Sequence, residues 1–322
     1  MNQRVPTQLL VEAAKMYYLQ GYSQQKVADE LHVSRSSISL YLAQARAMGI
    51  IEIHYIVNDP NENNDELSKK MCEMFSLKAC KVIPSNIRDH EVSTKLVASR
   101  VAEYMNELLK DGITIGIAWG TTLHEFINDY SCTKELEGIS VVPLVGGSDS
   151  VNYSFLQNEM AREFAERING TPSYIYAPLE TDSKQESQLY LESSHMLMLR
   201  QKWASLDLGV VGIGIAPDRE LEDEDINKDV VDAFMASRNA VCDICARRFD
   251  IFGELIDDGY NERLVAISSA ELQQAKYVLA VASGVRKTCA IIGGLRSGLI
   301  SELICDELTI KNVLKAAEYM KT

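Results

Sequence analysis

Glycine and hydroxyl residues follow one apolar stretch of the chain in an order that could bind an anion. Residues 113–118 predict a strand, and Gly120, Thr121 and Thr122 come directly after it, where a predicted helix begins. Free backbone N–H groups and the positive end of a helix dipole favour a phosphate at such a position. The stretch is not a P-loop, because no Gly-Lys-Ser/Thr follows. The alternative is a turn that needs one glycine and two capping hydroxyls.

Two other predicted strand ends carry residues that could meet the same ligand. Gly146 and Gly147 follow the apolar run at 139–144, and paired glycines let a backbone approach a ligand closely. A plain loop could use them equally well. Lys287 follows Gly284 where another helix should begin, and a lysine opposes the helix dipole there unless an anion is bound. A solvated lysine is the alternative explanation.

Cys242 and Cys245 form a C-x-x-C sequence, which can signal a metal or redox site. A zinc site needs two more ligands, but there is no second cysteine pair and the five histidines are scattered. A thioredoxin-like site would lie in a much smaller domain. We therefore expect no metal and no cofactor. Asp243 and Asp250 are interpreted as acceptors of hydrogen bonds from ligand hydroxyls.

Residues 23–49 have the pattern of a helix-turn-helix. Val27 and Leu31 share one helical face, and a second apolar face follows at helical spacing, formed by Ile38, Leu42 and Ala45. Ser34 suits the N-cap of the second helix and Gly49 its end. The turn residue is His32, which must accept a left-handed backbone. An ordinary helical hairpin is the alternative.

In a helix-turn-helix the second helix enters the major groove of DNA. Its polar face here offers Arg35, which can bind guanine in a bidentate manner, and Gln44, which can bind adenine. Serines serve a base or a phosphate, and the exposed Leu40 can touch a thymine methyl group. The candidate DNA-binding residues are Lys26, Ser34, Arg35, Ser36, Ser39 and Gln44.

The net charge of −14 over 322 residues is unevenly distributed. Residues 1–57 carry five basic and four acidic side chains, a balance of +1, so the remainder carries −15. Such a weakly basic domain implies modest DNA affinity per copy, and we expect a homodimer or homotetramer to share one operator. The seven cysteines, the absence of a signal peptide and the lack of a membrane-spanning apolar run predict a cytoplasmic protein.

Two domains are predicted: a helix-turn-helix domain at 1–57 with a strand at 50–57 that could form a wing, and an effector-binding and oligomerisation domain at 65–322. Residues 58–64 are polar and form the linker. In the second domain, short apolar runs alternate with helical patterns, which favours a Rossmann-like parallel sheet covered by helices. Strands are predicted at 79–83, 113–118, 139–144, 173–176, 208–213, 264–267, 277–281 and 301–305. Helices are predicted at 8–20, 91–109, 123–130, 155–168, 184–201, 288–295 and 308–320.

In sequence order, these motifs make the chain similar to the SorC family of bacterial sugar-responsive transcriptional regulators. The resemblance rests on SQQKVADELHVSRSSISLYLAQA, GIAWGTTL, VVPLVGG, VVGIGI and VASGVRKTCAIIGGLRSGLI, and it covers nearly the whole chain. It implies a phosphorylated sugar as effector, with the phosphate on Gly120, Thr121 and Thr122 and the sugar near Asp243 and Lys287. Some members have a lysine where this chain has Val145, so a Schiff base is not expected there.

The sequence thus predicts a transcriptional regulator of a carbohydrate-utilisation operon and not an enzyme. The expected protein is a repressor that binds operator DNA and a phosphorylated sugar or polyol. The expected effector-binding residues are Gly120, Thr121, Thr122, Gly146, Gly147, Asp243, Cys245 and Lys287. The rival interpretation is a sugar-phosphate isomerase or deaminase with an N-terminal regulatory domain, but no pair of acidic residues marks a general base. A purely architectural DNA-binding protein is disfavoured, because the ligand-type domain is most of the chain.

Overall fold

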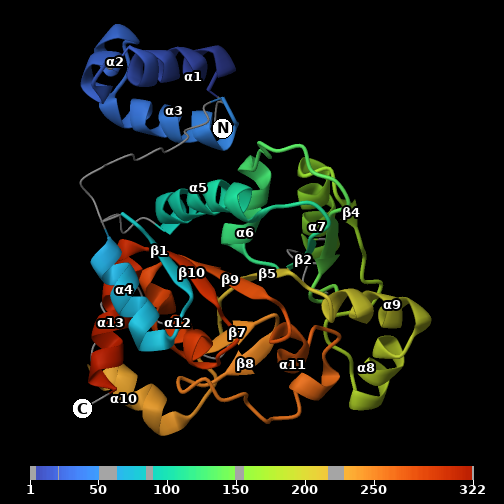
Figure 1. The fold of residues 1–322 in the computed structure, drawn as a ribbon. Helices are drawn as coiled ribbons and strands as arrows, with labels where there is room; N and C mark the ends of the chain where they lie inside the picture. Colours follow the sequence, from blue (N-terminus) through green and yellow to red (C-terminus); the bar gives the residue numbers. More distant parts are fainter. Residues whose placement is uncertain are drawn as a thin grey trace. The chain divides into compact units, whose positions relative to one another are not determined.

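The computed structural model describes residues 5–20, 22–50, 64–84, 90–148, 156–216 and 228–320. The chain divides into two compact units, Met1–Tyr55 and Ile56–Thr322 (Figure 1). Each unit is described by itself. The predicted wing strand, apart from Ile50, and the predicted linker, apart from Asn64, lie outside the described residues.

The first unit is a small helical domain. Helix α1 (Thr7–Ala14) continues into a π-helical turn (Lys15–Leu19), and α2 (Gln24–Glu30) and α3 (Arg35–Ala47) follow. Its apolar side chains are buried between the helices: Ala13, Val27, Ala28, Ile38 and Leu42 in one cluster, and Leu10, Ala14 and Ala45 in another. The two helices of the predicted helix-turn-helix and the buried face of its second helix are therefore confirmed.

The second unit is built on a seven-stranded parallel sheet. The strands are β1 (Ala79–Ile83), β2 (Thr114–Ile117), β3 (Ser140–Pro143), β4 (Thr171–Pro172), β5 (Leu208–Gly212), β9 (Tyr277–Ala282) and β10 (Glu302–Asp306), in the spatial order β1-β10-β9-β5-β2-β3-β4. Every pairing between neighbours is parallel. The expected α/β fold with a Rossmann-like sheet is confirmed.

Helices cover both faces of this sheet. The helices described in this unit are α4 (Asp65–Phe75), α5 (His90–Leu108), α6 (Thr121–Asp129), α7 (Leu156–Arg167), α8 (Lys184–Leu191), α9 (Ser194–Trp203), α10 (Lys228–Ser237), α11 (Ser269–Leu272), α12 (Thr288–Arg296) and α13 (Glu307–Tyr319). In Figure 1, α5 and α6 lie on one side of the sheet, and α12 and α13 on the other. The helix predicted at 184–201 is two helices, because Ser193 begins a new one by accepting a hydrogen bond from the N–H of Met196 at 3.3 Å.

A second, antiparallel sheet is not foreseen by the sequence patterns. It consists of β6 (Gly214–Ile215), β7 (Cys242–Ile244) and β8 (Arg247–Phe249). Its strands have two or three residues each, too short to show an alternation of apolar and polar side chains.

Two predicted strands are wrong. Residues 173–176 follow the two-residue edge strand β4 without joining it, and Pro172 within that strand lacks an N–H donor. Residues 264–267 are buried but pair only at single residues, Leu264 with Glu180 and Ala266 with Val145. Their apolar character reflects burial under neighbouring loops rather than membership of the sheet.

Candidate functional site

A cavity of about 440 Å³ lies where the order of the parallel strands reverses. After β2 the chain moves outward to β3 on one side, whereas after β5 it moves to β9 on the other, so the reversal lies between the adjacent strands β2 and β5. Ligands of open α/β sheets bind at this place, beyond the carboxyl ends of the strands. The lining residues come from the ends of β2, β5 and β9 and from the small sheet: Trp119, Gly120, Thr121, Thr122, Leu123, Gly212, Ile213, Gly214, Ile215, Asp243, Val281, Arg286 and Lys287.

The first wall of the cavity is the start of α6. Gly120 occupies the N-cap with φ +138°, a backbone conformation that favours glycine, and no side chain caps the helix. Thr121 is exposed and Thr122 is buried, and both line the cavity. The N–H groups of the first turn and the positive end of the dipole therefore face a space of ligand size, as an anion site requires.

The second wall is the loop that follows β9. Gly284, with φ +102°, donates its N–H to Oδ2 of Asp306 at 3.0 Å, and the same carboxylate caps α13 through the N–H of Thr309 at 2.8 Å. The preceding Ser283 is buried and shares a 2.8 Å hydrogen bond with Ser93 on α5. These contacts fix the 3-10 turn Val285–Lys287. Its two cations, Arg286 and Lys287, both line the cavity.

The small antiparallel sheet supplies the acidic wall. Asp243 of β7 pairs with Gly214 of β6 on one side and with Arg248 of β8 on the other. A Cβ atom on Gly214 would lie 2.2 Å from Oδ2 of Asp243, so the carboxylate lies against bare backbone. The glycine therefore makes room for Asp243 at the edge of the cavity.

Burial shifts the pKa values of the charged groups in this cavity. Burial raises the pKa of Asp243, although the amino group of Lys287, the N–H of Ala246 and the guanidinium of Arg248 oppose the rise. Burial lowers the pKa of Lys287, and the nearby Asp243 opposes that shift. An acid and a base with opposed pKa shifts in one cavity are typical of a functional site.

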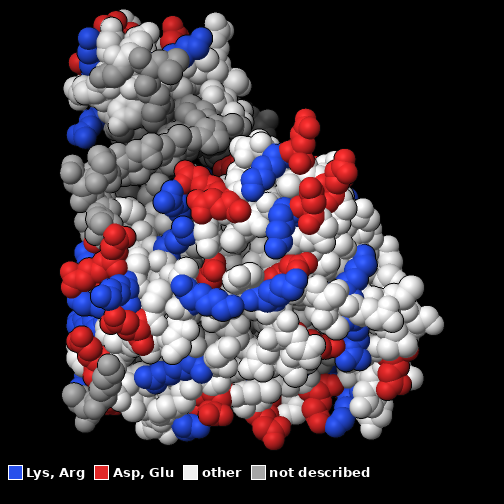
Figure 2. Space-filling model, in the orientation of Figure 1, with Lys and Arg blue, Asp and Glu red and all other residues white. Residues whose placement is uncertain are grey.

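Basic side chains also gather on the surface near the cavity. Figure 2 shows a band of Lys and Arg across the middle of the second unit, over the region between β9 and β7, while acidic and basic side chains alternate elsewhere on this face. The local excess of positive charge is notable in a unit that is strongly acidic as a whole, and it favours an anionic ligand.

The structure brings together Gly120, Thr121, Thr122, Asp243 and Lys287, which the sequence placed in one site from separate stretches. Gly146, Gly147 and Cys245 are not among the lining residues. Asp250 was interpreted wrongly: it is buried, its Oδ1 accepts the N–H groups of Phe252 and Glu254 at 2.9 Å each, and its Oδ2 pairs with Arg238 at 2.9 Å. It stabilises a turn and has no free acceptor role in the cavity.

Gly146 is required by protein packing. A Cβ atom there would lie 2.7 Å from the carbonyl oxygen of Pro178 and 2.9 Å from that of Ala177. Its N–H donates to the carbonyl of Val265 at 2.9 Å. The close backbone approach predicted for this glycine exists, but the partner is the chain itself.

We expect Gly146→Ala to lower the free energy of unfolding by ~1–3 kcal/mol, the usual cost of overpacking, and to leave ligand affinity unchanged. Gly294→Ala is the matched control. Its Cβ would meet side chains only at 3.5 Å or more, inside a helix, so it should be neutral or stabilising by up to ~1 kcal/mol. Urea unfolding of both variants measures the difference, and equal stabilities would contradict the packing role.

Cys242 and Cys245 are free, buried thiols, and burial raises the pKa of each. Cys245 and Ala246 form the tight turn between β7 and β8, and both have positive φ, +51° and +64°. Such a hairpin turn usually uses Asn or Gly. Within the described residues, no group of three or more His, Cys, Asp or Glu side chains could hold a metal ion.

The sequence analysis missed Gly212 and Gly214, which line the cavity from the end of β5 and the start of β6. The signal was present, because VVGIGI places two glycines after an apolar strand, as PLVGG does. The carboxylate of Asp243 in the neighbouring strand β7 explains the glycine at 214, and sequence spacing alone could not predict that contact. A Cβ atom on the other, Gly212, would lie 3.0 Å from the carbonyl oxygen of Trp119.

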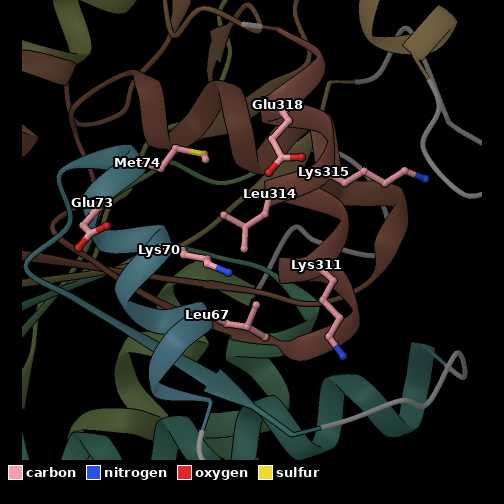
Figure 3. Close-up of a pocket in the computed structure, with 8 residues that line it drawn as sticks. All are labelled: Leu67, Lys70, Glu73, Met74, Lys311, Leu314, Lys315 and Glu318. Carbon is pink, nitrogen blue, oxygen red and sulfur yellow. The ribbon is translucent and has the colours of Figure 1, made fainter.

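A second cavity, of about 560 Å³, lies between α4 and α13 (Figure 3). Its floor is apolar, formed by Leu67, Met74 and Leu314, and three lysines stand at its rim. Lys70 pairs with Glu66 at 2.7 Å and Lys311 pairs with Glu307. In Figure 3, the amino groups of Lys311 and Lys315 point away from α4. Polar groups do not converge there, so the cavity at the strand ends is the better candidate.

The first unit presents a separate candidate surface for DNA. Val33 and Ser34 connect α2 to α3 after His32, whose φ of +53° confirms the predicted left-handed turn. Ser34 caps α3 by accepting the N–H of Ser37 at 3.1 Å. At the other end, Gly49 has φ +66° and the N–H of Ile50 donates to the carbonyl of Ala45 at 2.9 Å, which is a Schellman ending.

The outer face of α3 is accessible between Arg35 and Gln44. Arg35, Ser36, Ser39 and Leu40 are exposed, Leu40 by 54%, and Gln44 is partly exposed. On α2, the amino group of Lys26 lies 3.6 Å above the ring of Tyr22. The predicted DNA-binding side chains are therefore available on one small domain.

Comparisons with known proteins cover nearly the whole chain. A family model described as "Putative sugar-binding domain" matches residues 59–315. A deoxyribonucleoside regulator of Bacillus subtilis is 29% identical over 96% of this chain and 97% of its own. The sorbitol operon regulator of Klebsiella pneumoniae is 27% identical over 95% of this chain and 98% of its own. The crystal structure of the full-length sorbitol operon regulator SorC from that organism has a TM-score of 0.69 and covers 97% of this chain and 100% of its own. Among the described helices of the present structure, none is long and apolar enough to cross a membrane.

Proposed function

Because the chain belongs to the SorC family of sugar-responsive transcriptional regulators, we propose that a phosphorylated sugar or polyol controls its binding to operator DNA. The protein is a transcriptional regulator with a sugar-binding domain. The proposed finer role is that of a cytoplasmic repressor of a carbohydrate-utilisation operon. The named relatives favour this role over a sugar-phosphate isomerase or deaminase.

One observation carries the proposal of a phosphorylated effector. The uncapped start of α6 and the cations Arg286 and Lys287 line the same cavity. A phosphate dianion needs both N–H donors and a nearby positive charge, and charge-assisted hydrogen bonds of this kind are the strong ones. Asp243 lies in the same cavity and can accept hydrogen bonds from sugar hydroxyls.

The control of DNA binding would work by linkage. An effector that binds one arrangement of an oligomer more tightly shifts the population toward it, and operator affinity changes by the same coupling free energy. An oligomer is proposed because the first 57 residues carry a balance of only +1, so one copy makes few favourable phosphate contacts. Several copies on one operator raise the overall affinity.

Thermal unfolding against a panel of sugar phosphates tests the effector class. A ligand at 100 times its dissociation constant stabilises the folded state by ~2.7 kcal/mol, which raises the melting temperature measurably. Each sugar phosphate is paired with its unphosphorylated sugar. The proposal fails if the best ligand carries no phosphate or comparable anion. Turnover of any sugar phosphate by the purified protein would instead support the rival interpretation, a sugar-phosphate isomerase or deaminase.

We expect Lys287→Ala to weaken effector binding by ~1.5–3 kcal/mol, the usual worth of a hydrogen bond to a charged group. The variant should still bind operator DNA, because the substitution lies in the second unit. Arg286→Ala, tested in parallel, shows which of the two cations meets the phosphate. Calorimetric titration with the best sugar phosphate measures both, and parental affinity in both variants would contradict the proposed phosphate site.

A further inference from the structure

The loop that carries both cations of the cavity is tied to the start of α13. Strands β9 and β10 pair in parallel with Ala282 beside Cys305, so the residues that follow the two strands lie next to each other. Oδ2 of Asp306 accepts the N–H of Gly284 at 3.0 Å and the hydroxyl of Thr309 at 2.7 Å, while Oδ1 accepts the N–H of Thr309 at 2.8 Å. One carboxylate therefore caps α13 and holds the loop.

Burial makes this connection hard to break. Asp306 is 2% exposed and Thr309 0%, and the hydroxyl oxygen of Thr309 is a second acceptor for the N–H of Gly284, at 3.1 Å. A buried polar group that loses its partner keeps the cost of desolvation, so the loop and the helix start stay together. Gly284 precedes the turn that bears Arg286 and Lys287. The position of these two cations therefore depends on α13.

Further along, α13 faces α4 across the second cavity (Figure 3). Leu67 and Met74 of α4 and Leu314 of α13 line this cavity of about 560 Å³. The ion pairs of Lys70 and Lys311 each join residues of a single helix. Close-packed helices leave few voids larger than a water molecule, so a gap of this size leaves room for one helix to slide along the other.

Helix α4 is the first described helix of the second unit, and the predicted linker at 58–64 directly precedes it. Because the linker joins the second unit at α4, a displacement of α4 moves the point at which the DNA-binding unit is attached. The contacts thus form one continuous series from the cavity through the loop after β9, Asp306 and α13 to α4.

We propose that Asp306 is a positioning residue that ties the cations of the effector cavity to α13, and that α13 transmits effector binding to α4 by sliding along it. An anion that draws Arg286 and Lys287 inward displaces Gly284, and the shared carboxylate makes α13 follow. The effector then binds one position of α13 more tightly than the other, which is the differential affinity that coupling requires. The inference rests on the proposed anionic effector and adds the route by which its binding leaves the cavity.

A second connection of the same loop provides an internal reference. Ser283 shares a 2.8 Å hydrogen bond with Ser93 of α5, and this bond does not involve Asp306. Breaking the link to α13 should therefore leave α5 responsive to a ligand in the cavity. A response that is lost in α13 and α4 but kept in α5 distinguishes the proposed route from a general loosening of the loop.

Hydrogen–deuterium exchange of the full chain tests the route, with inorganic phosphate as the probe and sodium chloride of equal ionic strength as the reference. In the parent, phosphate should slow exchange at the start of α6 and change it in α13 and α4 by at least about threefold. In Asp306→Ser/Thr309→Val, the responses of α6 and α5 should remain and those of α13 and α4 should disappear. Phosphate is added to equal protection of α6 in both chains, which separates coupling from affinity.

The double variant removes the link and keeps the helix cap. Serine is as good an N-cap as aspartate, but its one hydroxyl oxygen cannot also hold the N–H of Gly284. Ser193→Ala is the matched control, because it removes the N-cap of α9 away from the cavity. It should lower stability and leave every response to phosphate unchanged. If the double variant does not fold, Asp306→Asn replaces it, since one of the two N–H groups then faces an amide donor.

Two results would overturn the route: a parental response of α4 in the variant, or a parent in which phosphate protects α6 but leaves α13 and α4 unchanged. If phosphate does not protect α6 in the parent, the proposed phosphate site fails. The chains without phosphate then decide the route. The variant must exchange at least about threefold faster than Ser193→Ala both at residues 283–288 and in α4, and otherwise the route is refuted as well.

Discussion

Replacing Thr122 by Asp is expected to abolish the response to a phosphorylated effector. The residue is buried at the second position of α6 and lines the cavity beside the helix start. An aspartate there places a fixed negative charge where the phosphate would bind, and juxtaposed like charges cost several kcal/mol. We expect affinity for the best sugar phosphate to fall by at least ~100-fold, measured by calorimetry and by effector titration of operator binding.

The variant should remain folded, because an acidic residue in the first turn of a helix interacts favourably with its dipole. Ala270→Asp is the matched control. It introduces the same charge at the second position of α11, at an exposed residue that does not line the cavity. The control should titrate like the parent. Parental effector affinity in Thr122→Asp would remove the start of α6 from the phosphate site.

The cavity was predictable where the sequence carries a local signal. Gly120, Thr121 and Thr122 come just after one apolar run, and Lys287 comes five residues after another. Parallel strands bring such ends to one edge of a sheet. The helix-turn-helix was equally local, down to the left-handed backbone of His32. Alternation of strands and helices was enough for the parallel sheet.

The predictions that failed concern residues whose roles depend on contacts with distant parts of the chain. Gly146 and Gly214 both come shortly after an apolar run, yet a Cβ atom on Gly146 would meet the carbonyl of Pro178 and one on Gly214 the carboxylate of Asp243. Asp243 and Asp250 lie seven residues apart in one hairpin region, and only the pairing of β7 with β6 sends the first to the cavity. Sequence spacing gives no information about such partners, so the lining by Gly212 and Gly214 was missed.

Replacing Arg35 by Ala should weaken specific operator binding by ~1–3 kcal/mol, roughly 5- to 150-fold, and relax the preference at one base pair in each half-site. Arg35 is the first residue of α3, it is exposed, and the first turn of a reading helix contacts base edges. The helix should persist, since its cap is the hydroxyl of Ser34 and its packing rests on Ile38, Leu42 and Ala45.

Lys26→Ala separates base reading from phosphate binding. Lys26 lies on α2, the helix that crosses the DNA backbone in this motif, and its amino group is accessible above the ring of Tyr22. Its loss should weaken binding to all DNA sequences alike and reduce the slope of log affinity against log salt by about 1. Arg35→Ala should instead change the ranking of operator variants in a competition experiment. If its ranking and affinity equal those of the parent, α3 does not read bases through Arg35, and the outer face centred on Ser39 and Leu40 becomes the next surface to test.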